Sequence, residues 1–293
     1  MANGSFSDEI QMAGVAVRNA LSVDVEDYFQ VSAFEGVIPR SEWADRSLRV
    51  VNNTYRLVEL FEQHGVKATF FTLGWVAERS PRLVRDIVDA GHELASHGYD
   101  HTRVTKMDAA GFKEDVVRTK KTLEDASGAA VTGYRAPTFS IDRSTPWALP
   151  ILAETGHLYS SSVYPVKHDL YGTVGEDRFP YHEQQSGLLE IPVSTIRLCG
   201  RNIPCGGGGY FRLYPYGFTR WCFRRINERE ARSGVFYMHP WEIDIEQPRL
   251  NGISMKARFR HYINLKNTEH RLRRLLTDFN WGRMDEIFLR SST

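Results

Sequence analysis

The sequence has few cysteines, almost no net charge and no long apolar run, and each absence excludes a class of protein. Its three cysteines, Cys199, Cys205 and Cys222, form no C-x-x-C pair, so neither a disulfide framework nor a structural zinc site is predicted. The 37 basic and 36 acidic residues leave a net charge of +1, so no nucleic-acid partner is expected. No apolar run approaches the roughly 18 residues that a transmembrane helix requires.

The N-terminal segment lacks the pattern of a secretory leader. Residues 1–18 contain no basic stretch followed by an apolar core. We therefore expect a cytoplasmic protein in which residues 1–18 are a flexible segment. No linker rich in proline, serine or charge divides the rest of the chain, and its 42% hydrophobic content suffices for a full core. Residues 19–293 are accordingly expected to form a single domain with long loops.

Helix and strand patterns alternate along the first half of the chain. Strand patterns cover residues 15–23, 66–73, 92–97 and 130–137, and helix patterns cover residues 51–63, 81–88 and 108–127. Gly65, Gly91 and Gly128 follow the helices where C-caps belong. Short connections in β-α-β order favour parallel strands, and hence an α/β barrel or a layered sheet.

Polar residues follow four of the predicted strands, at the carboxyl ends where α/β folds carry their chemistry. The motifs are S-V-D-V-E-D after the first strand, S-H-G-Y-D-H after the third, Y-R-A-P-T after the fourth and M-H-P-W late in the chain. From Tyr159 onward the pattern is irregular, and it includes the glycine run Gly206–Gly209. We expect long loops that wall a cleft, although a purely structural glycine turn fits the run equally well.

The S-V-D-V-E-D stretch places three carboxylates within four residues, at Asp24, Glu26 and Asp27. Like charges repel, and the repulsion grows as a site loses water. One interpretation is an acidic turn that is exposed to water. The other is a site in which a bound cation neutralises the three carboxylates.

A pair of histidines favours the cation. His97 and His101 are four residues apart, so their imidazoles can converge on one ion from a helical turn or a tight loop. The pair alone is a weak signal in a chain with ten histidines. Two histidines and one carboxylate of the acid cluster, however, make a catalytic ligand set for a divalent metal. The sequence therefore predicts a divalent metal site, with zinc as the expected ion.

The ordered set of acid cluster, S-H-x-x-x-H, R-x-P and a late apolar-x-His resembles the polysaccharide deacetylase family, the NodB-homology or carbohydrate esterase family 4 group. Later stretches such as G-G-G-G-Y-F-R-L-Y-P-Y-G resemble the subfamily associated with bacterial exopolysaccharide and exosortase loci. The likeness runs from about Asn19 to Trp281. It implies a distorted (β/α) barrel with about seven strands, formed by a catalytic domain over residues 19–293. The implied reaction is metal-dependent removal of N-acetyl groups from amino sugars during exopolysaccharide biosynthesis.

The resemblance also implies a role for each matching residue. Asp24 takes the position of the catalytic base, His97 and His101 those of metal ligands, Arg135 that of the residue that orients the base, and His239 that of the general acid. The chemistry requires this division of labour, because an amide is a poor electrophile with a poor leaving group. A metal polarises the carbonyl, an anionic group takes a proton from water, and a second group protonates the departing amine.

The first motif departs from the commonest family pattern, which has two adjacent aspartates. Here D-x-E-D leaves two alternatives for the third metal ligand. Strand alternation places Glu26 on the same face as Asp24, which favours Glu26. A twist or bulge at the strand end would present Asp27 instead.

Further departures concern the substrate cleft. Thr138 follows R-A-P in place of the usual tyrosine, although its backbone N–H could still serve an oxyanion hole. Ser160 stands where the family pattern has an aspartate. Together with Pro137 and Trp241, Thr138 is expected to contact the substrate, while core packing is the alternative for the tryptophan.

The expected partner is a glycan, or an amino sugar linked to a lipid or a nucleotide. Two other functions stay open: hydrolysis of a non-sugar amide such as a cyclic ureide on the same scaffold, and an inactive carbohydrate-binding scaffold. Residues 256–290 contain nine Lys and Arg against four Asp and Glu. This basic segment is interpreted as a solvated helical face, or as a peripheral contact with an anionic membrane.

Overall fold

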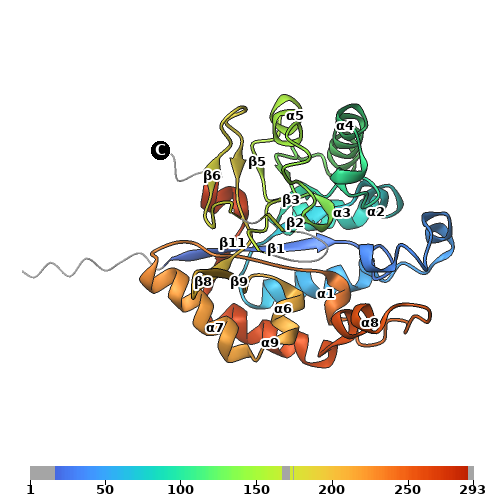
Figure 1. Cartoon of the computed structure of the whole chain (residues 1–293). Coiled ribbons are helices and arrows are strands. Elements are labelled where there is room, and N and C mark those ends of the chain that lie inside the picture. Colours follow the sequence, from blue (N-terminus) through green and yellow to red (C-terminus); the bar gives the residue numbers. More distant parts are fainter. Residues whose placement is uncertain (1–16, 167–171, 174, 290–293) are drawn as a thin grey trace, which may run out of the picture.

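The computed structural model describes residues 17–166, 172–173 and 175–289 (Figure 1). Its helices are α1 (Val50–Gln63), α2 (Gly74–Arg79), α3 (Pro81–Asp89), α4 (Ala109–Ser127), α5 (Ala148–Glu154), α6 (Gly208–Leu213), α7 (Tyr216–Arg224), α8 (Met255–Tyr262) and α9 (Leu265–Asp278). Its strands are β1 (Arg18–Val25), β2 (Thr69–Thr72), β3 (Glu93–Ser96), β4 (Gly133–Tyr134), β5 (Tyr159–Ser160), β6 (Tyr181–His182), β7 (Leu189–Glu190), β8 (Thr195–Leu198), β9 (Arg201–Pro204), β10 (Val235–Met238) and β11 (Asn280–Gly282). The predicted flexible segment falls almost entirely outside the described residues.

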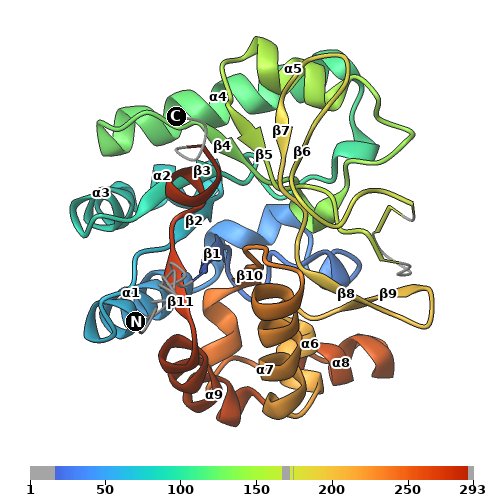
Figure 2. The same ribbon diagram turned by 90° about the vertical axis from the view of Figure 1, so that its left-hand side faces the viewer.

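Within the described residues, nine strands form one sheet in the order β10-β1-β2-β3-β4-β5-β7-β6, with β11 pairing beside β1. Its strand pairs are parallel except for β6 with β7. Figure 2 shows these strands along an arc, with α1, α3, α4 and α5 on its outer side. The α/β class and the distorted (β/α) barrel are therefore confirmed. The resemblance implied about seven strands; the sheet of the described residues has nine, of which β4 to β7 have two residues each.

The first strand ends later than its apolar pattern suggested. The prediction covered residues 15–23, of which 15 and 16 lie outside the described residues, whereas β1 continues to Val25. The continuation has a physical cause: β2 pairs with β1 as far as Val25, opposite Thr72, and β10 pairs with it as far as Val23, opposite Met238. Asp24 therefore lies inside a buried strand and not in a loop after it.

Local sequence signals fix the helices around the sheet. The Asp108 carboxylate caps α4 by accepting a hydrogen bond from Gly111 N at 2.8 Å, and Gly128 ends the helix with φ +73°. Pro81 occupies the first turn of α3, as predicted. The largest core cluster joins β1, β2 and β10 to α1 and α9. Among the described helices, none has the length and apolar character needed to cross a bilayer.

Candidate active site

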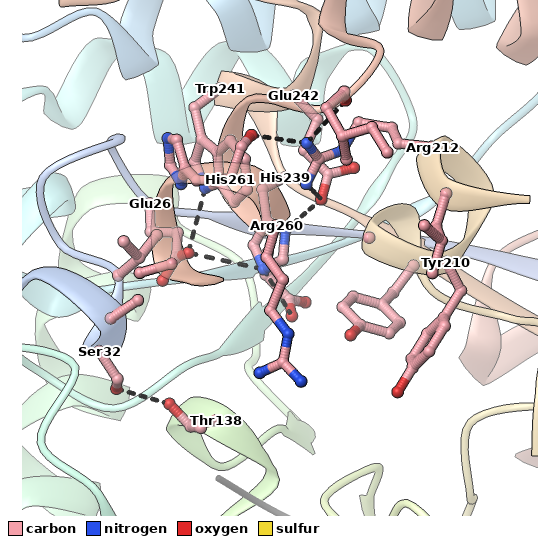
Figure 3. Close-up of a pocket in the computed structure, with 18 of the residues that line it drawn as sticks. Glu26, Ser32, Thr138, Tyr210, Arg212, His239, Trp241, Glu242, Arg260 and His261 are labelled. Atoms are coloured by element: carbon pink, nitrogen blue, oxygen red, sulfur yellow. Dashed lines mark hydrogen bonds and ion pairs between the residues drawn. The ribbon is translucent and has the colours of Figure 1, made fainter. Parts of the chain in front are cut away.

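The carboxyl ends of β1, β3 and β10 open into a pocket of about 530 Å³ (Figure 3). Parallel strands bring their carboxyl ends to one edge of the sheet, so motifs far apart in the sequence meet there. The predicted site residues that line the pocket are Asp24, Glu26, His97, His101, Thr138, His239 and Trp241. Asp27, Arg135 and Pro137 are buried and do not line it.

Three of these side chains form a compact ligand set. One atom each from Glu26, His97 and His101 lies within 4.8 Å of the other two, and all three residues are buried. His97 Nδ1 donates to the Arg135 carbonyl at 2.9 Å, which leaves Nε2 as the lone-pair nitrogen. Glu26 Oε2 faces His101 Nε2 at 2.8 Å, and within the described chain His101 Nδ1 has no hydrogen-bond partner. A buried carboxylate and two imidazoles this close together fit a site that is completed by a metal ion.

The electrostatics of the set agree with metal binding, which needs anionic carboxylate and neutral imidazole. Burial lowers the pKa of His97 to about 4. Burial raises the pKa of Glu26, but the neighbouring His101 and His239 outweigh it and hold that pKa well below its ordinary value. Glu26 and His97 are therefore in the protonation states of ligands at neutral pH.

The S-H-G-Y-D-H motif is a tight loop and not a helical turn. Gly98 has φ +73° and His101 has φ +59°, and both values lie in the left-handed region. Asp115 of α4 fixes the loop by accepting hydrogen bonds from Tyr99 N at 3.2 and 3.3 Å. This conformation brings both histidines to the same side, 2.8 Å separating His101 Nε2 from Glu26 Oε2.

Beside the ligand set lies a buried ion pair. Arg135 Nη1 donates to Asp24 Oδ1 at 2.6 Å and to Ser22 Oγ at 2.9 Å, and neither Asp24 nor Arg135 is more than 2% exposed. The other guanidinium nitrogens donate to the Ser161 carbonyl and hydroxyl. The guanidinium carbon lies 4.1 Å from the centroid of the Phe71 ring. These contacts fix the direction of one carboxylate oxygen and leave the other free to face the pocket.

His239 lies beside this pair. Its Nε2 lies 3.9 Å from Asp24 Oδ2 and 3.5 Å from Glu26 Oε1, while its Nδ1 lies 3.0 Å from Glu242 Oε1. Burial lowers the pKa of His239, but the carboxylates of Glu26, Glu242 and Asp24 outweigh burial and raise it to about 9. The imidazole therefore carries a proton that it can donate.

The sequence did not reveal the group behind His239. Glu242 is 1% exposed, and Arg212, itself fully enclosed, approaches the same carboxylate at 3.6 Å (Figure 3). The glycine run supplies the space, because a Cβ on Gly208 would overlap the Glu242 side chain. The spacing H-P-W-E, three residues from histidine to carboxylate, was the available signal for this contact.

Asp27 makes different contacts from Glu26. Its Oδ2 accepts from the backbone N–H groups of Arg49 and Val50, at the start of α1, and its Oδ1 accepts from Tyr28 N. Burial raises the pKa of Asp27 to about 6, against these three hydrogen bonds. The carboxylate thus caps a helix, and the geometry favours Glu26 over Asp27 as the third ligand.

The three residues expected to contact substrate differ in how they are placed relative to the pocket. Thr138 lines the pocket, adopts φ +57° and shares a 2.7 Å hydrogen bond with Ser32. Pro137 is buried beside Gly98. Trp241 is 6% exposed, donates to Glu26 Oε1 at 3.2 Å and stacks at 5.0 Å on His239. This tryptophan therefore holds site residues and offers little surface to a sugar.

The open (β/α) barrel carries a buried cluster of two histidines and one carboxylate at the carboxyl end of its sheet. The protein is therefore of the class that has a candidate catalytic metal centre at this end of an α/β sheet. Comparison with known sequences divides the chain into two matched regions. Residues 44–158 match the profile described as polysaccharide deacetylase, and residues 161–289 match a profile described as a domain of unknown function. Residues 44–158 thus form a polysaccharide deacetylase region, and residues 161–289 follow it as the second matched region.

Curated relatives match a limited stretch. The chain is 32% identical over 96 residues to the peptidoglycan-N-acetylglucosamine deacetylase of Bacillus cereus, covering 32% of this chain and 35% of that one. It is also 32% identical over 108 residues to the peptidoglycan deacetylase of Helicobacter pylori, covering 37% and 36%. The chain thus spans about a third of the length of these relatives.

Solved structures share the fold over nearly the whole chain. A Mycobacterium smegmatis protein assigned as a polysaccharide deacetylase superposes with a TM-score of 0.60 at 21% identity, covering 98% of this chain and 92% of that one. The allantoinase PuuE superposes with a TM-score of 0.58 at 17% identity, covering 94% and 90%. At these identities the likeness is one of fold alone.

Proposed function

We propose that the protein is a divalent-metal-dependent hydrolase that removes N-acetyl groups from the amino sugars of a polysaccharide or its precursor. One observation carries the proposal: a compact ligand set, an oriented carboxylate and a protonated histidine converge on a single pocket. The names of the related peptidoglycan deacetylases support an acetylated amino sugar as the substrate class.

Glu26, His97 and His101 would hold the metal, and zinc suits two imidazoles and one carboxylate with open coordination positions. A bound divalent cation supplies Lewis-acid chemistry, which polarises the amide carbonyl and makes water a better nucleophile. The protein contributes the rest. Trp241 orients Glu26 through its indole N–H, and the Arg135 carbonyl orients the His97 ring.

Asp24 acts as the general base in this proposal. Its Oδ1 is held by Arg135, so the proton of the attacking water passes to Oδ2, the oxygen nearer His239. His239 then protonates the leaving nitrogen through Nε2, while Glu242 holds its Nδ1. The backbone N–H of Thr138 is assigned to the developing oxyanion, and the positive φ of this residue is the local strain that such a role would justify.

The two matched regions are proposed to form one catalytic domain over residues 19–293. Strands from both lie in the same sheet: β5, at the junction, pairs with β4 on one side and with β7 on the other. The second region also supplies β10, whose end carries His239. We infer that residues 161–289 complete the active site.

Removing the metal is expected to abolish activity. Dialysis of the full chain against a strong chelator should stop acetate release from acetylated amino-sugar oligomers, and added zinc or cobalt should restore it, because the carbonyl is no longer polarised without the ion. Metal content by elemental analysis, measured beside the rate, checks the result. Full activity in a verified metal-free sample would contradict the proposal.

The same assay separates the alternative functions. The panel should include nucleotide sugars, soluble oligomers and a cyclic ureide such as allantoin, since the allantoinase shares the fold. Turnover of the ureide alone would replace the proposed function with amide hydrolysis on a non-sugar substrate. Metal binding without turnover of any member would favour a binding scaffold.

Replacing His239 by alanine is expected to lower kcat by about 10²- to 10⁴-fold with unchanged metal content, because a general acid is lost and no ligand is. Glu242→Gln should lower kcat less, and it should have almost no further effect in the His239→Ala background, because Glu242 acts through the imidazole. Additive losses in the double variant would make Glu242 a structural residue only. Loss of metal from His239→Ala would make His239 a ligand.

A further inference from the structure

A series of aromatic rings leads away from the pocket along α6 and α7. Tyr210 of α6 lines the pocket (Figure 3), and its ring stacks on that of Tyr214 with 6.0 Å between the centroids. The contacts continue from Tyr214 to Phe218 at 4.8 Å and from Phe218 to Trp221 at 5.8 Å. Each ring thus touches the next from the pocket wall onto α7, and we call Tyr210, Tyr214, Phe218 and Trp221 the aromatic row.

The local sequence sets the course of the row. Pro215 cannot continue a helix, so it separates α6 from α7 and leaves Tyr214 at the junction. Phe218 and Trp221 are three residues apart in α7, which puts them on the same side of that helix. Figure 1 shows α6 and α7 on the same side of the sheet. The row therefore follows the outer side of this helix pair.

The row is separate from the main core. The core takes three other aromatic residues from the same two helices and their connection, and all are buried: Phe211, Tyr216 and Phe223. In the row, Trp221 is 43% exposed, and Tyr214 and Phe218 are half-buried. Leu213, beside Tyr210 at the pocket, is 42% exposed. Single exposed apolar residues need no explanation, but a connected group at a pocket indicates a surface that binds something.

We propose that the aromatic row binds further sugar units of the polysaccharide whose N-acetyl group is removed in the pocket. The inference rests on the function proposed above and specifies its substrate as a polymer, not a single-sugar precursor. The electron-rich face of an aromatic ring attracts the C–H groups on the apolar face of a sugar ring, while tyrosine O–H and tryptophan N–H reach polar groups at the edge. One ring per step matches the width of a six-membered sugar ring.

Continuity with the pocket selects a glycan as the occupant. Tyr210 belongs both to the pocket wall and to the row, so a chain with one sugar at the catalytic residues reaches the row along the same surface. A stable protein partner requires a broad interface, whereas the row is one ring wide. Sugar units bound outside the pocket would supply binding energy that positions the reacting unit.

Calorimetric titration of the full-length protein with β-1,4-linked N-acetylglucosamine oligomers tests the inference, and acetate release is measured separately on the same preparations. The affinity for the hexamer should exceed that for the dimer by about tenfold or more, because only the longer chain reaches the row. Trp221→Ala should lower the hexamer affinity by about tenfold and the dimer affinity far less. In the kinetics the loss should raise KM and not lower kcat, because Trp221 does not line the pocket.

Two control variants separate an aromatic contact from a general effect of substitution. Trp221→Phe keeps an aromatic face and should bind the hexamer within about threefold of the wild type. Leu158→Ala truncates an apolar side chain that is 54% exposed outside the row, and it should bind like the wild type. Equal affinity for dimer and hexamer, or unchanged hexamer affinity in Trp221→Ala, would overturn the inference. So would a changed oligomeric state in Trp221→Ala, since the row would then join two copies of the chain.

The two measurements distinguish failure of this inference from failure of the proposed function. Acetate release without any dependence of affinity on oligomer length would remove the row and leave the deacetylase function standing. Hexamer binding that depends on Trp221, without acetate release, would retain the row as a glycan-binding surface and remove the deacetylase function.

Discussion

Asp24→Asn is expected to lower kcat by about 10²- to 10⁴-fold while the metal content stays at the wild-type level. Asparagine keeps the shape of the side chain but cannot take a proton from water. The three ligand residues are untouched, because Asp24 stands outside the cluster of Glu26, His97 and His101. Steady-state rates, together with elemental analysis of the same preparation, check both parts of the expectation.

The variant also leaves Arg135 buried without its counter-charge. Breaking a buried ion pair costs on the order of 3–5 kcal/mol in stability, so thermal unfolding must be measured beside the rate. Ser22→Ala is the matched control, because it removes a neutral partner of the same guanidinium nitrogen and leaves the base in place. A folded Asp24→Asn protein with wild-type turnover would assign the base to another group. A folded protein without metal would make Asp24 a ligand.

The position of the candidate active site could be predicted from the sequence, because it depends on the order of the strands along the chain. Parallel strands end at one edge, so motifs that follow β1, β3 and β10 must meet, whatever the loops do. The spacing of His97 and His101 adds a local constraint that a tight loop satisfies. Asp24 and Arg135 could be expected together for the same reason, and their hydrogen bond is direct.

The support around these residues could not be predicted, because it arises from packing between distant segments. Glu242 reaches His239 only since Gly208 leaves room for its carboxylate and Arg212 closes the space behind it. Trp241 lines the pocket and stacks on the imidazoles of His239 and His261. No periodicity encodes such contacts, and the two-residue strands of the sheet are likewise too short for an alternating pattern.

The choice between Glu26 and Asp27 is decided by an experiment with opposite expected results. Glu26→Gln should weaken metal binding by more than about 100-fold, since removing a direct ligand costs more than removing the residues that orient ligands, and turnover should fall with it. Asp27→Asn should bind metal like the wild type, because both of its oxygens already accept backbone hydrogen bonds. Competition titration with a zinc chelator measures both affinities.

Asp27→Asn is expected to act on stability instead. Asparagine has one acceptor oxygen where the carboxylate has two, so its amide group would face a backbone N–H at Tyr28 or at the start of α1. The loss of this cap should lower the free energy of unfolding by about 1–2 kcal/mol. Chemical denaturation in the presence of saturating metal measures the change. A metal-deficient Asp27→Asn protein beside a metal-replete Glu26→Gln protein would reverse the assignment, and unchanged affinity in both would return the acid cluster to a turn without a metal.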